Sequence, residues 1–298
     1  MAVKTVGILS TGDMGAAIGS VLRQHGPDVI TSLDGRSELS RLRASEADIR
    51  DAGSVDAVVA ESDIVVSVLV PSEALRIAEE VAAGMARTNA RPVFADCNAI
   101  APQTVERIAA RMATVGATFV DAGIIGSPPK PNGRNNGRIY CSGPDTTRFE
   151  ELAQYGLDIR RVGPGIGQAS GLKMVFAAST KGTTALWTEL LVAAKAMGLM
   201  EPLMAEFSPN ANEVSRQLMG SVTGMPRRAR RWIGEMEEIA LTFGHLGMTP
   251  KILEGAADMF RMVDETPLAD QTSREPDPEL QAMLESLASR LSDHSGQD

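Results

Sequence analysis

A row of polar side chains lies on one long segment that the sequence predicts to be helical, from about Gln168 to Met197. At about 100° per residue, one side of this helix carries a cation, a small residue and two hydroxyls: Lys173, Ala177, Thr180 and Thr184. Lys181 lies roughly 80° further round. A lysine amine in a dry crevice can donate or accept a proton, so this side is a candidate for acid–base chemistry. The helix alone also allows a buried spine with two solvated lysines.

The same segment has an apolar side and is long enough to leave one domain and form the spine of another. Its apolar residues fall near helical spacing: Leu172, Phe176, Leu186, Leu190, Ala194 and Met197. Gly171 and Gly182 interrupt the helix-forming residues, and glycine is tolerated there when something approaches the backbone closely. We expect strands and short helices before this segment and mostly helices after it.

A second candidate site is a glycine-containing turn near the N-terminus. The apolar run Thr5–Leu9 predicts a strand, and a helical pattern continues through Leu22. The turn between them contains the candidate cofactor-binding residues Ser10, Thr11, Gly12, Asp13, Met14 and Gly15. Strand, glycine turn and helix is the context in which backbone N–H groups bind the pyrophosphate of a dinucleotide. Ser10 stands where the fingerprint has its first glycine, so an ordinary strand-to-helix turn is the alternative.

The next expected strand, Asp28–Leu33, ends at residues that select between the two nicotinamide cofactors. Arg36 and Ser37 suit the 2′-phosphate of NADP(H), whereas Asp34 suits the ribose hydroxyl of NAD(H). Arg41 and Arg43 add positive charge close by. We therefore predict NADP(H) as the cofactor, with NAD(H) as the alternative.

Further strands alternate with helices, which predicts a parallel sheet covered on both faces. The expected strands are 64–69, 92–95, 118–120, 138–142 and 158–162, with helices at 73–87 and 101–115. Ligands bind at the carboxyl ends of such strands. We place three segments there: Val70–Pro71, Asp96–Asn98 and Asp121–Pro129. The Asn98 amide is a candidate cofactor contact or a turn residue, and loop 126–138 is a lid or a solvated hairpin.

Composition excludes several classes of protein. A net charge of −9 and a pI of about 5.0 argue against a nucleic-acid partner. The two cysteines, Cys97 and Cys141, belong to no metal-like cluster, so we expect no metal and a reducing cytoplasm. No apolar run reaches the length of a membrane span, and the N-terminus does not read as a signal peptide.

The C-terminal part reads as a series of helices, which we expect at 199–208, 210–220, 225–243, 250–264 and 278–291. Four arginines, Arg227, Arg228, Arg230 and Arg231, open one of them. Four arginines on one helix cannot all face one ligand, so we expect most of them to be surface or interface cations.

Together these landmarks resemble the β-hydroxyacid dehydrogenase superfamily, which includes 3-hydroxyisobutyrate dehydrogenase and 6-phosphogluconate dehydrogenase. The segments GQASGLKM and RWIGEMEEIALTF are similar to a 6-phosphogluconate dehydrogenase-like subgroup of NAD(P)-dependent oxidoreductases. The resemblance implies an α/β fold: an N-terminal Rossmann-like doubly wound sheet, and an all-α C-terminal domain joined by a long helix. We expect the NAD(P)-binding domain at 1–164 and the helical domain for substrate binding and dimerisation at 165–298. The resemblance also implies a homodimer formed through the helical domain.

Carried over residue by residue, the resemblance matches the cofactor half better than the substrate half. The catalytic lysine of the family follows a glycine by six residues, which assigns that role to Lys173. The family's substrate loop falls on Asp121–Ser127, where the usual serine is Ile125, Gly126 is kept and Ser127 replaces a glycine. Two further family residues are changed: the asparagine one turn after the lysine is Ala177, and the resemblance places an acidic residue near Glu237 where the family has a second lysine.

The resemblance implies hydride transfer between nicotinamide and a hydroxyl or carbonyl carbon, with Lys173 as general acid and base. The predicted substrate-binding residues are Ile125, Gly126, Ser127, Ala177, Thr180 and Lys181. Either Thr180 or Lys181 would make the hydrogen bond that Ala177 cannot make. Two other readings stay open: an imine reductase on the same fold, and a non-catalytic NADP(H) sensor.

Overall fold

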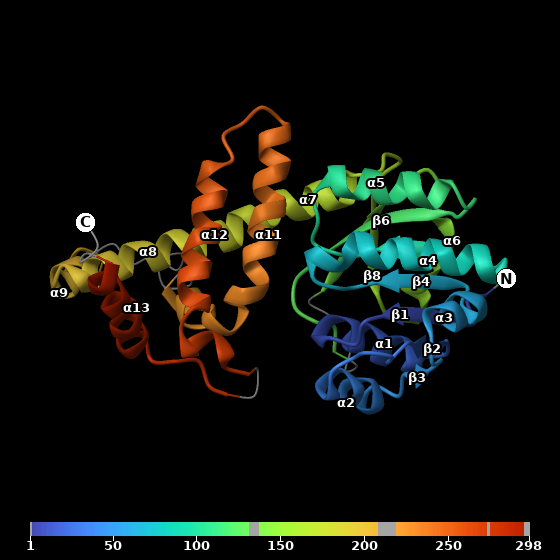
Figure 1. The fold of residues 1–298 in the computed structure, drawn as a ribbon, viewed down its shortest axis with the longest axis horizontal. Helices are drawn as coiled ribbons and strands as arrows, with labels where there is room; N and C mark the ends of the chain where they lie inside the picture. Colours follow the sequence, from blue (N-terminus) through green and yellow to red (C-terminus); the bar gives the residue numbers. More distant parts are fainter. Residues whose placement is uncertain (1, 131–136, 208–218, 273–274, 295–298) are drawn as a thin grey trace. The chain divides into compact units, whose positions relative to one another are not determined.

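The chain forms two compact units, Met1–Met174 and Val175–Asp298, in a computed structural model. The structure describes residues 2–130, 137–207, 219–272 and 275–294, with helices and strands labelled in Figure 1. The predicted helix at 210–220 and part of loop 126–138 lie largely outside these residues. The predicted domain ranges, 1–164 and 165–298, stay a prediction about which parts fold independently.

The first unit is built on one mixed sheet, whose eight described strands have the order β3-β2-β1-β4-β5-β6-β7-β8. The strands are β1 (Thr5–Leu9), β2 (Asp28–Thr31), β3 (Arg50–Asp51), β4 (Ile64–Ser67), β5 (Val93–Asp96), β6 (Phe119–Ile125), β7 (Arg138–Ser142) and β8 (Asp158–Gly163). Every neighbouring pair is parallel except β6 and β7, which differs from the expected all-parallel sheet. The strand order reverses direction between β1 and β4, which is the switch point where open α/β sheets bind ligands.

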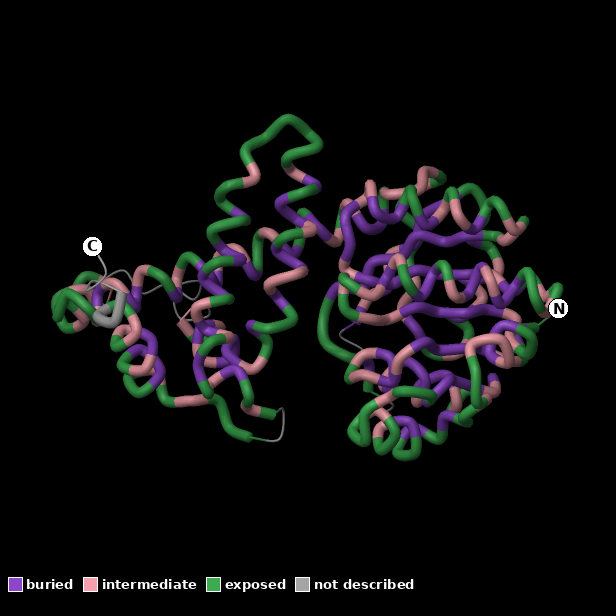
Figure 2. The backbone as a smooth tube through the Cα atoms, in the orientation of Figure 1, coloured by how far each residue is buried: buried purple, intermediate pink, exposed green. Residues whose placement is uncertain are grey.

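Helices cover both faces of this sheet, because successive strand side chains point to opposite faces. They are α1 (Asp13–His25), α2 (Glu38–Glu46), α3 (Val55–Glu61), α4 (Ala74–Thr88), α5 (Pro102–Ala113) and α6 (Thr147–Glu150). On β1, Ile8 joins a core cluster that includes residues of α1, whereas Leu9 joins one that includes residues of α3, α4 and α5. Strands β1, β2, β4, β5 and β6 are accordingly buried throughout most of their length, whereas the edge strands β3 and β8 are not (Figure 2). A doubly wound sheet is thus confirmed.

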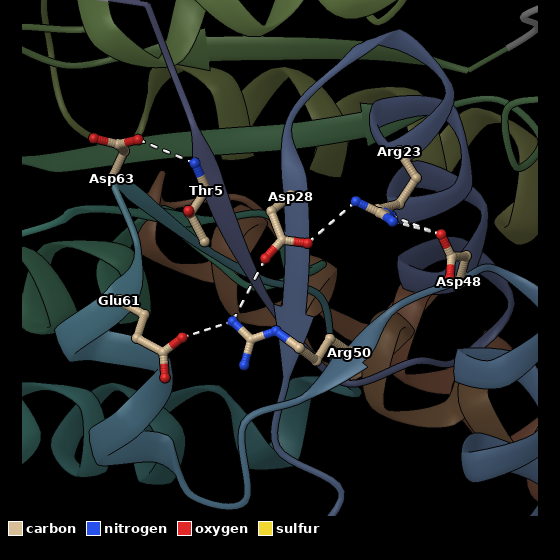
Figure 3. Close-up of polar contacts among 7 residues, drawn as sticks. All are labelled: Thr5, Arg23, Asp28, Asp48, Arg50, Glu61 and Asp63. Carbon is tan, nitrogen blue, oxygen red and sulfur yellow. Dashed lines mark hydrogen bonds and ion pairs between the residues drawn. The ribbon is translucent and has the colours of Figure 1, made fainter.

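The amino ends of the strands are tied by charged side chains (Figure 3). The Asp63 carboxylate accepts hydrogen bonds from the backbone N–H groups of Lys4, at 2.7 Å, and Thr5, at 3.1 Å. Arg23 and Arg50 both contact Asp28, at 3.1 and 3.5 Å. This network lies at the edge opposite the carboxyl ends of β1 and β4. It therefore stabilises the sheet and does not contribute residues to the edge where a ligand is expected.

The long helix begins at Gln168 and ends at Ala196, one residue before the predicted end. It is continuous over 29 residues but consists of α7 (Gln168–Ala177), a π-helical turn (Ala178–Gly182) and α8 (Thr183–Ala196). A π turn widens the helix by one residue, and single π turns occur often at functional sites. The sequence pattern predicted the helix but not this turn.

The second unit is helical: α8 is followed by α9 (Met200–Phe207), α11 (Pro226–His245), α12 (Lys251–Asp264) and α13 (Leu280–His294). Helices α11 and α12 form a hairpin, visible in orange in Figure 1, and α8 contacts both α12 and α13. Gly182 faces the hairpin, and a Cβ there would be in ordinary van der Waals contact with Leu253, at 3.6 Å, and Met236, at 3.9 Å.

Within one chain, much of the apolar side of the spine is exposed. Leu172, Phe176, Leu186 and Met197 are 38%, 42%, 59% and 65% exposed, whereas Ala194 on the same side is buried. The residues of the spine that are buried in this chain are small, hydroxyl-bearing or apolar, together with one lysine: Ala177, Lys181, Thr184, Ala185, Thr188 and Leu191. The sequence predicts the apolar side, but small and hydroxyl residues count little in an apolar pattern and gave no sign that they would be buried.

Candidate active site

The glycine turn after β1 has the geometry of a tight strand-to-helix connection. Ser10 adopts a φ of +86°, in the left-handed region that favours glycine, at a cost of about 1 kcal/mol for other residues. A Cβ on Gly15 would overlap the carbonyl oxygen of Ser10 and lie 3.3 Å from Ile8. Gly15 is therefore required for α1 to pack on β1, and the turn keeps its shape although Ser10 replaces a glycine.

The N-terminus of α1 is an open anion site. Gly12 is its N-cap and no side chain caps the helix. A Cβ on Gly12 would meet only the Ser10 hydroxyl, 4.0 Å away, so a ligand can approach the backbone here. The N–H groups of the first turn and the helix dipole together favour a phosphate.

The other side chains of this turn point to the protein rather than to the ligand position. The buried Thr11 hydroxyl donates to the carbonyl of Ser40 at 2.7 Å, and Asp13 forms an ion pair with Arg43. Met14 packs against the core beneath the sheet. The fingerprint residues thus act through their backbone, and their side chains fix the loop to α1, α2 and the core.

After β2, the predicted 2′-phosphate residues open α2. The Ser37 hydroxyl accepts a hydrogen bond from the backbone N–H of Ser40 at 3.3 Å and caps α2. Arg36 is half-buried and lines a cavity together with Asp34. Arg41 donates to the carbonyl of Leu33 at 2.5 Å, which holds the loop in place. Of the three arginines that follow β2, namely Arg36, Arg41 and Arg43, Arg36 lines this cavity.

The amide of Asn98 is used entirely within the protein. Its Oδ1 accepts from the N–H of Leu69 at 2.5 Å, and its Nδ2 donates to Ser67 at 2.9 Å and Asp96 at 2.8 Å. Asn98 is 2% exposed. It ties the end of β5 to the end of β4, directly before Val70 and Pro71, so its effect on a ligand at those residues is indirect.

Asp96 lies beneath this amide and is fully buried. Burial, together with the charge of Asp121, its register partner on β6, raises the pKa of Asp96 to about 7, although the backbone and side-chain N–H groups of Asn98 stabilise its charged form. A carboxyl group that titrates near neutral pH therefore lies at the carboxyl end of β5.

Asp121 caps the long helix. Its Oδ2 accepts hydrogen bonds from the N–H groups of Gly167, Ala169 and Ser170, at 3.0, 3.0 and 3.2 Å, and from the Ser142 hydroxyl at 2.9 Å. We had placed residues 121–129 in a loop beyond a strand; residues 121–125 are instead part of β6. A buried carboxylate on β6 thus fixes where α7 begins, and with it the position of Lys173.

Lys173 is held at the carboxyl end of β6. Its Nζ donates to the carbonyl oxygen of Ile124 at 2.5 Å, and the side chain is half-buried. A Cβ on Gly123 would lie 2.9 Å from the Cβ of Lys173, so the absent side chain of Gly123 lets α7 approach the strand. Because β1, β4, β5 and β6 are parallel, the amine lies at the same edge of the sheet as the glycine turn.

Comparison with known proteins agrees with this geometry. Residues 5–155 match a family described as the NAD binding domain of 6-phosphogluconate dehydrogenase. The chain belongs to this family. Residues 194–263 also match a domain of unknown function, DUF1932. The 6-phosphogluconate dehydrogenase-type domain explains the open N-terminus of α1 as a site for a nicotinamide dinucleotide.

Solved structures extend the likeness over most of the chain. A conserved protein of unknown function, reported as similar to 3-hydroxyacid dehydrogenases, is 29% identical, with a TM-score of 0.64 over 90% of this chain and 100% of that chain. The Mycobacterium tuberculosis 3-hydroxyisobutyrate dehydrogenase with L-serine is 19% identical, with a TM-score of 0.66 over 96% and 99%. A Myxococcus stipitatus imine reductase variant with NAD+ is 19% identical, with a TM-score of 0.53 over 96% and 99%. The last two show the fold alone.

The segment predicted to be the substrate loop of this 6-phosphogluconate dehydrogenase-type chain presents few polar side chains. Ile125 is the last residue of β6 and is buried. Gly126 follows with a φ of +114°, which favours glycine, and Ser127 is exposed. The loop therefore offers backbone groups and one serine hydroxyl where the resembled family has a serine and two glycines.

The remaining predicted substrate residues belong to the second unit. Ala177 is buried, and the Thr180 hydroxyl donates to the carbonyls of Phe176 and Ala177 at 3.4 and 3.3 Å. Lys181 forms a buried ion pair with Glu235 and lies 5.6 Å from the ring centre of Trp232. The polar groups of Thr180 and Lys181 thus have partners within this unit.

The arginines of α11 are also engaged there. Arg227 pairs with Asp277 at 2.5 Å, and Arg230 contacts Asp264 and Asp270 at 2.8 and 3.0 Å. Arg231 pairs with Glu235 at 3.3 Å, and Arg228 stacks at 6.0 Å from Trp232. The expectation that most of them are surface or interface cations agrees with these ion pairs at α11.

Two absences concern only the part of the chain that the structure describes. No cluster of three or more histidine, cysteine, aspartate or glutamate side chains is arranged there to hold a metal ion. No helix within those ranges combines the length and the apolar character that crossing a bilayer requires.

Sequence reasoning missed two features of the site. The capping role of Asp121 was hidden because its target, the start of α7, is 46 residues away from it in sequence. Arg76 on α4 lines the cavity beside Arg36. Its position in the first turn of a helix that follows the carboxyl end of β4 is the signal that would have identified it.

Proposed function

We propose that this protein is an NADP(H)-dependent oxidoreductase that transfers hydride between nicotinamide and the hydroxyl or carbonyl carbon of a small hydroxy acid or a related substrate. The observation that supports it best is the Lys173 amine at the carboxyl edge of β6, the edge that also carries the open N-terminus of α1. In this proposal the N–H groups at Gly12 and the first turn of α1 bind the pyrophosphate. Arg36 and Ser37 bind the 2′-phosphate, which favours NADP(H) over NAD(H).

NADP(H), when bound, supplies or accepts the hydride. Lys173 acts as the general acid and base that transfers the proton. In the reducing direction its ammonium polarises the substrate carbonyl and donates a proton to the oxygen; in the oxidising direction its amine accepts the hydroxyl proton. The contact with Ile124 fixes the direction of Nζ, and the packing of α7 against Gly123 fixes the position of the helix. Placement of this one group is the contribution of the protein to the chemical step.

Substitution of Lys173 tests the proposal. Lys173→Ala keeps the Cβ that contacts Gly123, so α7 stays packed while the amine is lost. We expect turnover to fall by more than ~100-fold while NADPH affinity changes little. The matched control is Lys195→Ala, which removes a lysine from the same long helix that is paired with Glu285 at 2.8 Å. Unchanged turnover in Lys173→Ala would show that another group transfers the proton.

A turnover screen separates the alternatives. The substrates are 3-hydroxy acids and their semialdehydes on one side and cyclic imines on the other. The buried Ile125 in place of a serine favours imines as substrates, because it removes a hydroxyl that would bind a carboxylate. The presence of Lys173 favours hydroxy acids instead. Turnover of imines alone would replace the proposal by an imine reductase. Cofactor binding without any turnover would replace it by a sensor.

We also propose that the protein forms a homodimer through its helical unit. Apolar side chains on the spine are exposed within one chain, among them Val175 at 56%, Leu186 at 59% and Met197 at 65%. Exposed apolar side chains in such number are typical of an interface. Light scattering of the purified chain measures the oligomeric state, and Leu186→Asp should shift it toward the monomer. A monomeric wild-type protein at micromolar concentration would refute this proposal.

A further inference from the structure

A cavity of about 350 Å³ lies beyond the carboxyl end of β2 in the first unit. Its walls come from three places: Ser32 to Arg36 after β2, Ser54 and Val55 at the start of α3, and Arg76, Ile77 and Glu80 on α4. This volume is within the ~300–1,000 Å³ of small-ligand sites. The loop after β2 carries the residues that select the cofactor, so the cavity is the place for the adenosine end of a dinucleotide.

Two arginines enter this cavity from different elements. Arg36 comes from the loop after β2, and among the residues that the structure describes it is paired with no carboxylate. Arg76 comes from α4, where its Nε contacts Glu73 at 2.7 Å and its Nη1 contacts Glu80 at 2.9 Å. The two glutamates hold the Arg76 guanidinium against the helix without burying it, since its side chain is 55% exposed.

The charges around the cavity make Arg76 decisive. Asp34 and Glu80 contribute two negative charges, which Arg36 and Arg76 balance. Without Arg76 the cavity would carry net negative charge and would repel a phosphate. A ribose hydroxyl carries no charge and can donate to a carboxylate, so it would lose nothing by that change.

We propose that Arg76 is a second specificity-determining residue, which together with Arg36 binds the 2′-phosphate of NADP(H) from the side of α4. The inference rests on the proposed function for the identity of the cofactor. A guanidinium pairs with a phosphate through two parallel hydrogen bonds, and two guanidiniums from different elements that line one cavity can bind the same phosphate. Glu80 competes with the phosphate for Arg76, so it lowers the preference that Arg76 creates.

Binding measurements test this without any turnover. Isothermal titration is carried out with NADPH and NADH, and with adenosine 2′,5′-bisphosphate and adenosine 5′-monophosphate. Arg76→Ala should weaken NADPH and the bisphosphate by about tenfold or more and leave NADH and the monophosphate within about twofold. Glu80→Gln should act in the opposite direction and strengthen binding of the two ligands that carry the 2′-phosphate.

The matched control is Arg87→Ala. Arg87 lies on the same helix, is 56% exposed in its side chain, and pairs with Asp56 at 2.6 Å outside the cavity. It should leave all four affinities unchanged, which excludes a general effect of net charge or of helix stability. Equal effects of Arg76→Ala on ligands with and without the 2′-phosphate, or no effect, would overturn the inference. Selective binding by a protein that turns over no substrate would uphold it while refuting the catalytic proposal.

Discussion

The buried carboxyl of Asp96 makes the stability of the first unit depend on pH in an unusual direction. Its pKa is raised to about 7, against an ordinary value of 3.8, mainly because the side chain is buried. The folded state therefore keeps a proton that the unfolded chain has lost between these two values. In that window the unfolded state binds fewer protons, so stability falls as pH rises, and above about pH 7 the loss is complete.

The size of the effect follows from the two pKa values. They differ by about three pH units, and each unit corresponds to about 1.4 kcal/mol, which gives roughly 4 kcal/mol in total. Roughly 3 kcal/mol of this falls between pH 4.5 and pH 7.5. The variant Asp96→Asn cannot titrate, so the free energy of unfolding of the wild type minus that of the variant should decrease by this amount across the window.

Urea unfolding at several pH values measures this difference. Both tryptophans, Trp187 and Trp232, belong to the second unit, so tryptophan fluorescence monitors that unit alone. Circular dichroism reports the helices of both units, so a transition seen by circular dichroism but not by fluorescence belongs to the first unit. The control is Asp63→Asn. Hydrogen bonds from Lys4 and Thr5 and the ion pair with Arg148 lower the pKa of Asp63 although its partial burial opposes them, so its contribution is lost only as pH falls below about 4. A pH-independent difference for Asp96→Asn would refute the argument.

Two further predictions concern the glycine turn and the helical core. Gly15→Ala should destabilise the first unit by roughly 1–3 kcal/mol because its Cβ overlaps Ser10, whereas Gly12→Ala should melt like the wild type but bind NADPH at least about tenfold more weakly. Calorimetric melting and titration distinguish the two variants. Lys181→Met should cost roughly 1–3 kcal/mol because the buried Glu235 loses one of its two cations and keeps only Arg231, at 3.3 Å, and adding Glu235→Leu should restore most of it. Fluorescence of the neighbouring tryptophan follows this unfolding, and a double variant as unstable as the single one would contradict the reasoning.

The backbone of the first unit could be predicted closely from the sequence. Strand β1 and the start of β4 lie where apolar runs placed them, because buried strands are continuous apolar segments. The two-residue strand β3, Arg50–Asp51, was missed because both residues are charged and exposed. Its pairing with β2 depends on the neighbouring strand and not on its own composition. The ends of the long helix were predicted to within one residue, while its π turn at Ala178–Gly182 was not predicted, because an apolar pattern does not distinguish it from a regular helix.

The candidate site was harder to predict, since a polar residue at a strand end can bind a ligand or serve the protein. Asp121 and Asn98 are examples of the second case: each sits at a carboxyl edge, and one oxygen of each, Oδ2 of Asp121 and Oδ1 of Asn98, accepts from backbone N–H groups of other segments. The sequence shows the residue type but not whether an unpaired N–H lies within reach. Buried backbone N–H and C=O groups need hydrogen-bond partners in the folded protein, so the side-chain oxygens that serve as those partners do not bind a ligand.

The need for hydrogen-bond partners inside the protein therefore restricts which groups can recognise the cofactor and the substrate. The open N–H groups of α1 and the arginines at the cavity lie on elements that the internal hydrogen bonds of Asn98 and Asp121 do not use. Recognition of a dinucleotide by such a site would depend on backbone geometry and positive charge, which tolerate changes in the surrounding sequence. A substrate, in contrast, would meet Lys173 and a loop with few polar side chains. The type of reaction would therefore be set by the cofactor and the Lys173 amine, and the choice of substrate by the shape of the protein surface around them.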